Sequence, residues 1–130
     1  MTRRAIHRFK RVLEDMKAEL THSLENSVDR LVVSQSADAA DQMRDLREQE
    51  VASRNISLVM GRLRELEDAL RAIRKGSFGR CASCDDEIPI RRLEAVPWTS
   101  YCVACQEDAE AQQSERAESE HGLTLGPTLY

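Results

Sequence analysis

Four cysteines carry the clearest chemistry in this sequence, and they form two Cys-x2-Cys pairs separated by 17 residues. They are Cys81, Cys84, Cys102 and Cys105. This spacing is typical of a four-thiolate zinc site, because each pair offers two sulfurs to one ion and the intervening residues let the pairs meet. Four protein sulfurs leave no open position for a substrate, so the pattern predicts one structural zinc ion (Zn2+) per chain. Two disulfides or buried free thiols are the alternatives.

The segment that holds the cysteines, residues 77–106, is too short to fold around a hydrophobic core of its own. We therefore expect metal binding, which supplies about 10–16 kcal/mol in small zinc domains, to drive its folding. Trp98, which follows Pro97, is expected in the core of this domain. The histidines have no partner at metal-ligand spacing and are expected to face solvent: His7, His22 and His121.

Two long helical patterns precede the cysteines and must position them. Over residues 3–33, apolar side chains recur every three or four positions, at Ile6, Phe9, Leu13, Met16, Leu20, Leu24, Val28 and Leu31. A second pattern covers about 38–75, with apolar residues at Met43, Leu46, Ile56, Met60, Leu63, Leu66, Leu70 and Ile73. Arg74 and Lys75, followed by Gly76, are typical of a helix end.

The break at residues 34–37 joins the two patterns and predicts an antiparallel coiled-coil hairpin with its tip at 34–42. Its arms would be about 45–55 Å long. The stretch 47–55 is mostly polar, so we expect the contact between the arms to be weakest there. The predicted fold is thus mainly α: a hairpin over 1–76, a zinc-finger domain over 77–106, a C-terminal helix over 107–120 and a flexible tail over 121–130.

Composition excludes several other classes of protein. With 5 glycines and 3 prolines in 130 residues, an all-β fold lacks the turns it needs. The net charge of −4 argues against a generally basic nucleic-acid binder. No apolar stretch approaches the ~18 residues of a membrane span, and no apolar region follows the basic start as in a secretory signal. A reducing, cytoplasmic location is therefore expected.

Charge is nevertheless unevenly distributed along the chain. The first eleven residues carry five bases and no acid, whereas residues 106–120 carry six acids and one arginine. The hairpin would bring the basic start close to residue 75, beside the acidic segment, so we expect the two segments to neutralise each other. A basic arm that binds nucleic acid is the alternative.

Around the cysteines the sequence resembles the DksA/TraR zinc-finger family. The similarity is carried by residues 70–84, 88–97 and 102–105, and it is general in shape over 5–62. Members of this family insert a coiled-coil hairpin into the secondary channel of bacterial RNA polymerase and alter initiation at selected promoters. They do not themselves bind a DNA sequence. The resemblance therefore implies a non-enzymatic transcription regulator with RNA polymerase as its partner.

The resemblance also implies site residues at the hairpin tip. DksA-like members carry Asp-x-x-Asp-x-Ala there, and this sequence has Asp38 and Asp41, with Met43 in place of the alanine. Both aspartates would also suit a helix start, as a cap and as a first-turn acid. On the zinc-finger domain, Arg91 and Arg92 are expected to pair locally with Glu94, and contact with the polymerase is the alternative.

DksA-like members also bind guanosine tetraphosphate jointly with polymerase, through basic residues. The corresponding positions here are Glu65, Val96 and Gln106, and none is cationic. Because a polyphosphate needs several Arg or Lys donors, weak or absent alarmone binding is expected. A substitute cluster would have to come from Arg62, Arg91 and Arg92.

Two other functions fit the same residues. A zinc-thiolate redox sensor would release its metal when the cysteines are oxidised. A coiled-coil adaptor would use the zinc-finger domain to bind another protein.

Overall fold

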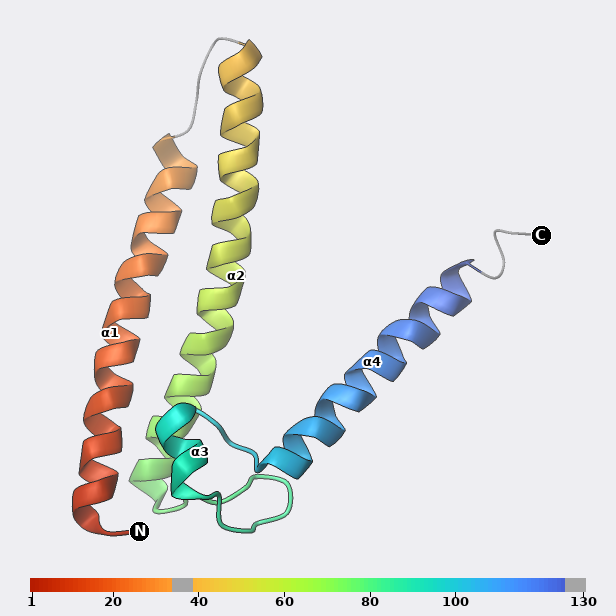
Figure 1. Ribbon diagram of the computed structural model, residues 1–130. Coiled ribbons are helices and arrows are strands. Elements are labelled where there is room, and N and C mark those ends of the chain that lie inside the picture. The colour runs from red at the N-terminus through yellow and green to blue at the C-terminus, as the bar shows by residue number, and fades with distance from the viewer. Residues whose placement is uncertain (34–38, 126–130) are drawn as a thin grey trace.

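The computed structural model describes residues 1–33 and 39–125. Four helices follow one another: α1 (Arg3–Val33), α2 (Ala39–Lys75), α3 (Ile90–Ala95) and α4 (Val103–Leu125). Figure 1 shows α1 and α2 side by side as a rod, α3 and the cysteine segment at its lower end, and α4 pointing away. The predicted mainly α fold is confirmed, and the described residues hold a single isolated β-bridge and no strand. No helix among them is long and apolar enough to cross a membrane.

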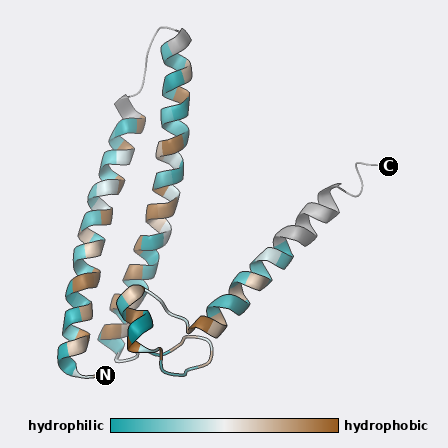
Figure 2. Cartoon of the chain, in the orientation of Figure 1, coloured by the Kyte–Doolittle hydropathy of each residue, from teal (hydrophilic) through white to brown (hydrophobic). Residues whose placement is uncertain are grey.

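The contact between α1 and α2 follows a strict seven-residue repeat. Along α1 the repeat runs through Leu13, Leu20 and Ser27, and Ser27 is only 7% exposed. Along α2 it includes Val59 and Leu66, both buried. Figure 2 shows apolar residues recurring along both arms and gathering where the arms meet the cysteine segment. Such a repeat keeps one face of each helix against its neighbour over the whole arm.

This register differs from the expected one at four positions. Val28 and Met60 were expected in the contact, but they are 43% and 47% exposed, because the heptad places their neighbours Ser27 and Val59 there. Met43 and Leu46, expected in the contact near the tip, are also exposed. Hydrophobicity suggested these residues, whereas the continuous repeat of the packed helices selects the residues seven positions apart.

A polar pair interrupts the apolar contact in the middle of the rod. The Asn55 side-chain amide donates a hydrogen bond of 2.6 Å from Nδ2 to the Ser27 hydroxyl oxygen. Both residues occupy the face between the helices, where an isolated polar layer tends to specify register at some cost in stability.

The second arm ends where Gly76 was expected to stop it. Gly76 has a φ of 79°, a left-handed conformation that glycine adopts without strain. Its N–H donates to the Ile73 carbonyl at 3.2 Å, and the Ser77 N–H donates to the Ala72 carbonyl at 2.9 Å. This pair of bonds is a Schellman motif, which turns the chain out of α2 and towards the cysteines.

The C-terminal helix is longer than the predicted 107–120. It begins at Val103, because the Cys102 carbonyl accepts the N–H of Gln106 at 2.9 Å and so starts the first turn within the second cysteine pair. It continues to Leu125 through part of the expected tail, since an interior glycine such as Gly122 weakens a helix without ending it. Residues 126–130 and most of the predicted tip, 34–38, lie outside the described residues.

We predict that removing one partner of the polar pair lowers stability and that replacing both partners by apolar residues does not. Ser27→Ala removes the acceptor of the Asn55 amide and should lower the free energy of unfolding by about 1 kcal/mol. The double variant Ser27→Ala/Asn55→Leu should recover that loss, because both polar partners are then gone. Urea unfolding followed by circular dichroism measures both changes. Val28→Ala is the control, and a loss there equal to that of Ser27→Ala would contradict the register.

Candidate metal centre and its attachment to the hairpin

The four cysteine sulfurs converge at the end of the rod. All four Sγ atoms lie within 4.8 Å of one another, and those of Cys84 and Cys102 are 3.8 Å apart. Four sulfurs placed about 2.3 Å from a central zinc ion form a tetrahedron with edges of about 3.8 Å. The arrangement therefore fits a single ion held by four thiolates.

A tight turn presents the first pair of cysteines. The Cys81 N–H donates to the Asp86 carbonyl at 2.8 Å, and the Asp85 N–H donates back to the Cys81 carbonyl at 2.9 Å. Asp85 has a φ of 63°, the left-handed conformation that Asp tolerates better than most residues. These contacts close the loop around Cys84 and direct both sulfurs to the same side.

The second pair lies at the start of α4. Cys102 immediately precedes the helix and Cys105 lies in its first turn, where no acidic side chain is present. The positive end of the helix dipole therefore faces the sulfurs, which are the nearest groups able to carry negative charge. A hydrogen bond of 2.7 Å from the Ala82 N–H to the Ser100 carbonyl ties the two cysteine pairs together.

Electrostatics at the site favour binding of a cation. The backbone N–H of Cys84, assisted by those of Cys102 and Ser83, lowers the pKa of Cys81 to about 6 against the opposing effect of burial. The N–H of Asp86 lowers the pKa of Cys84, but the neighbouring Cys81 sulfur, burial and the other two sulfurs together raise it to about 12. The pKa of Cys105 is also raised, first by Cys102. Four thiolates can therefore coexist here only around a positive ion that favours sulfur ligands.

The cysteine domain is not a separate body, because its core includes a residue of the hairpin. Phe9 of α1 is buried together with Cys81, Ile88 and Leu93. Its ring centroid lies 5.5 Å from that of Phe78, which also packs against the hairpin core around Leu13 and Leu66. Sequence periodicity assigned Phe9 to the helix contact alone, although its position at the open end of the hairpin, level with Gly76, was a signal of this role.

Trp98 has a different role from the one expected. It is half-buried and packs against the hairpin core, not against the buried cluster that contains Cys81. The guanidinium of Arg62 on α2 lies 3.8 Å above the centre of its ring. Trp98 therefore attaches the loop before α4 to the rod, through packing and a cation–π contact.

The two arginines of α3 differ in their contacts. Arg92 is half-buried, and its Nε donates to the Tyr101 carbonyl at 3.0 Å, so it supports the loop that leads to α4. Arg91 is exposed. Neither pairs with Glu94 in the described structure, because Glu94 instead lies 3.7 Å from Arg8 of α1. The expected local pairing is replaced by an ion pair that links α3 to the hairpin.

The tip residues and the cysteines lie at opposite ends of the rod. Asp41 is in the first turn of α2, as expected for an acid at a helix start. Between Asp41 and the end of α2 at Lys75 the helix rises about 51 Å. Asp38 lies outside the described residues.

The three positions at which alarmone contacts were considered line one pocket of about 600 Å³ beside Trp98. They are Glu65, Val96 and Gln106. Two further carboxylates line the same pocket, those of Asp68 and Glu110. Its two arginines are engaged, since Arg62 lies 3.6 Å from Glu65 and Arg92 donates to backbone. The pocket thus holds more carboxylates than guanidiniums.

We predict that Cys102→Ser abolishes stoichiometric metal binding and unfolds the cysteine domain, while most of the hairpin helix remains. The emission of Trp98 should then shift to the red, because the loop that holds it against α2 is released. Elemental analysis, far-ultraviolet circular dichroism and fluorescence measure the three effects. Ala104→Ser, within the same pair, should retain the metal. Reduced wild-type protein that holds no metal would contradict the assignment of the site.

Comparison with known proteins places this architecture in a family. Residues 76–111 match the family described as prokaryotic dksA/traR C4-type zinc finger. An uncharacterized protein of Aquifex aeolicus is 50% identical over 50 residues, which are 38% of this chain and 34% of that protein. The RNA polymerase-binding transcription factor DksA of Salmonella typhimurium is 31% identical over 123 residues, covering 90% of this chain and 79% of DksA.

Solved structures show the same fold. Transcription factor DksA2 from Pseudomonas aeruginosa superposes with a TM-score of 0.76 at 22% identity, covering 88% of this chain and 89% of that one. The RNA polymerase binding protein and transcriptional regulator Dks from Chlamydia trachomatis gives 0.55 at 26% identity, covering 87% and 95%. The named relatives are transcription factors, which confirms the expectation that the chain is not an enzyme. With its four-cysteine centre and helical hairpin, the chain belongs to the DksA/TraR family of C4-type zinc-finger proteins.

Proposed function

We propose that this protein is a cytoplasmic transcription regulator that binds bacterial RNA polymerase and inserts its hairpin tip into the secondary channel to modulate initiation. The observation that carries the proposal is a long, two-helix rod in a chain whose sequence aligns over 79% of the length of an RNA polymerase-binding DksA. The role needs neither an active site of its own nor recognition of a DNA sequence.

The shape of the rod supports insertion. Helix α2 has 37 residues and is about 55 Å long, and α1 accompanies it for most of that length. The cysteine domain widens only the end opposite the tip (Figure 1). A narrow rod with a wider base can enter a channel to a depth that its base limits.

Zinc is the metal that we assign to the site, with one ion per chain held by the four cysteines. Its chemistry there is to neutralise and crosslink four thiolates, which stabilises the domain. The residues of the domain then hold Phe9, Phe78 and Trp98 in place and so orient the rod.

Carboxylates at the tip are the groups that act inside the channel in this proposal. Asp41 lies at the start of α2, and Asp38 precedes it in the sequence. A polymerase active site contains magnesium ions and basic side chains, with which carboxylates interact favourably. Met43 is 61% exposed, so this substitution for alanine would also face the polymerase.

At the base of the rod, Arg91 is the better of the two candidate polymerase contacts. Its side chain is exposed, whereas that of Arg92 is engaged with the Tyr101 carbonyl. We assign Arg91 to the polymerase surface and Arg92 to the support of the loop.

We predict that Asp38→Asn/Asp41→Asn reduces the effect on transcription far more than binding to polymerase core. Asn caps helices about as well as Asp, so helix content should hold while charge is lost. Transcription in vitro and copurification with polymerase core measure the two quantities. Glu48→Gln/Glu50→Gln, which removes two carboxylates at exposed positions of α2, is the charge-matched control. Absence of polymerase binding by the wild type would refute the proposed function, whereas unchanged regulation by the double variant would refute only the role of the tip.

We also predict weak or absent potentiation by guanosine tetraphosphate. The pocket that contains Glu65 and Gln106 has too few free cations for a polyphosphate. Titration of the protein with and without the alarmone, on polymerase that lacks any other alarmone site, measures the effect. Glu65→Lys/Gln106→Lys should create a response. Strong synergy in the wild type that disappears in Arg62→Ala would show that a substitute cluster binds the ligand.

A further inference from the structure

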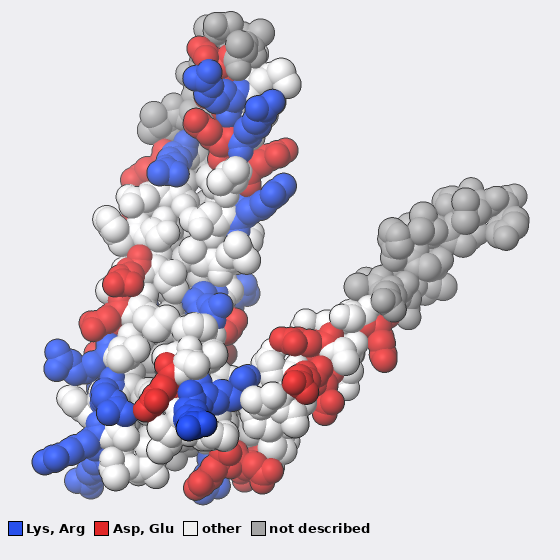
Figure 3. All heavy atoms as spheres, viewed as in Figure 1, with Lys and Arg blue, Asp and Glu red and all other residues white. Residues whose placement is uncertain are grey.

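The open end of the hairpin carries a surface of positive charge that the proposed role of the tip does not use. Segments 3–13 and 69–80 contain no acidic residue, although the whole chain has a net charge of −4. The antiparallel packing of α1 and α2 brings these segments together, and Figure 3 shows their Lys and Arg side chains at the lower end of the rod. We call this surface the basic end; its residues are Arg3, Arg4, Arg8, Lys10, Arg11, Arg71, Arg74 and Lys75.

The acidic segment of α4 does not neutralise the basic end. Helix α4 diverges from the rod, and in Figure 3 its acidic side chains lie apart from the basic residues of α1. The neutralisation expected from the sequence is therefore absent from the described part of the chain. The ion pairs that do occur at the basic end join exposed side chains, such as Arg8 with Glu94, and exposed pairs contribute little.

Five cations of the basic end make no ion pair with any described residue: Arg3, Arg4, Arg11, Arg74 and Lys75. Arg3 and Arg4 lie in the first turn of α1, at the positive end of the helix dipole, where acidic residues are favoured. These two arginines therefore oppose the stability of the helix that bears them. Charged residues that destabilise their own helix, with no protein contact to offset that cost, are expected where a bound ligand offsets it.

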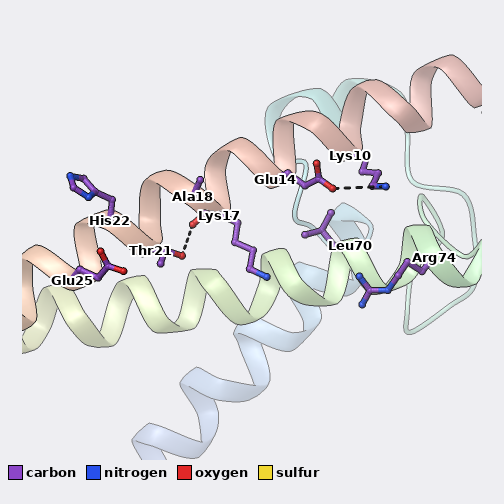
Figure 4. Close-up of a pocket in the computed structure, with 9 residues that line it drawn as sticks. All are labelled: Lys10, Glu14, Lys17, Ala18, Thr21, His22, Glu25, Leu70 and Arg74. Carbon is purple, nitrogen blue, oxygen red and sulfur yellow. Dashed lines mark hydrogen bonds and ion pairs between the residues drawn. The ribbon is translucent and has the colours of Figure 1, made fainter.

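Both helices contribute exposed cations to the basic end. Arg4 and Arg11 are exposed and seven residues apart, so they lie on one face of α1 about 10.5 Å from each other along its axis. Figure 4 shows Lys10 of α1, which pairs with Glu14, and Arg74 of α2 at the same hollow of about 630 Å³, which Glu25 also lines. The basic end thus combines cations from the first turns of α1 with Arg74 and Lys75 from the last turn of α2.

We propose that the basic end binds the phosphate backbone of a nucleic acid without reading its sequence. Double-stranded DNA offers one negative charge per ~1.7 Å of its axis, so several of its phosphates lie within reach of a cluster of exposed cations. Six of the eight cations are arginines, whose planar guanidinium pairs with phosphate in a bidentate manner. This function is additional to the proposed polymerase binding, and it is compatible with the absence of sequence recognition.

The test uses the metal-loaded full chain and a short fluorescein-labelled DNA duplex of arbitrary sequence. Binding is followed by fluorescence anisotropy between about 50 and 200 mM salt. The variant Arg3→Gln/Arg4→Gln/Arg11→Gln should weaken binding roughly tenfold or more at the lowest salt. It should also reduce the slope of log affinity against log salt by about 3, because each lost phosphate contact contributes about 0.9. Arg74→Gln/Lys75→Gln, on the other helix, should weaken binding as well.

The matched control removes the same charge elsewhere. Arg44→Gln/Arg47→Gln/Arg54→Gln changes three exposed arginines of α2 nearer the tip and should leave duplex binding unchanged. Equal losses in the two triple variants would overturn the proposal, because net charge alone would then explain binding. Absence of binding by the wild type at the lowest salt would also overturn it. A labelled polyglutamate peptide that binds as tightly, with the same sensitivity to the first triple variant, would assign the surface to an acidic protein instead.

Discussion

The packing of Phe9 and Phe78 around the cysteine cluster is the contact on which the rest of the structure depends. Phe9 belongs to the first helix and Cys81 follows the second, so one buried cluster joins both open ends of the hairpin to the metal centre. The cysteine domain could not fold around its own few apolar residues, and the rod alone leaves its open ends unattached. The shared core supplies the apolar residues that the cysteine domain lacks and attaches the open ends of the rod to it. The orientation of the rod therefore depends on an intact metal site.

Away from that joint, the rod is held by a narrow heptad contact whose composition changes along its length. Leu13, Leu66 and Leu70 fill it near the base, whereas Ser27 and Asn55 form a polar layer farther out. Burial, and with it hydrophobic stabilisation, is therefore greatest near the metal centre. A rod that is firm at its base and more weakly packed towards its tip suits a protein that is anchored at one end and acts at the other.

Charge is unevenly distributed over the described surface of the molecule. One acid, Asp41, lies in the first turn of α2, acidic side chains line the described part of α4, and arginines without a salt bridge gather at the open end of the hairpin. The pocket beside Trp98 contains both carboxylates and guanidiniums, and its two guanidiniums already have partners within the protein. Because exposed charges interact weakly over distances beyond about 10 Å, each region can serve a separate partner.

The sequence by itself determined the set of four cysteines, the two long helices and the end of α2 at Gly76. Cysteine spacing, apolar periodicity and helix capping each depend on residues that are close together in the chain. The tertiary structure alone decided the register, in which Ser27 and Val59 replace the more suggestive Val28 and Met60. It also decided that Phe9 completes the metal domain, that Trp98 packs on α2 and that α4 leaves the rod. These outcomes depend on which side chains become buried between the helices and the metal domain. Residues far apart in the sequence decide this together, once both helices and the domain are packed.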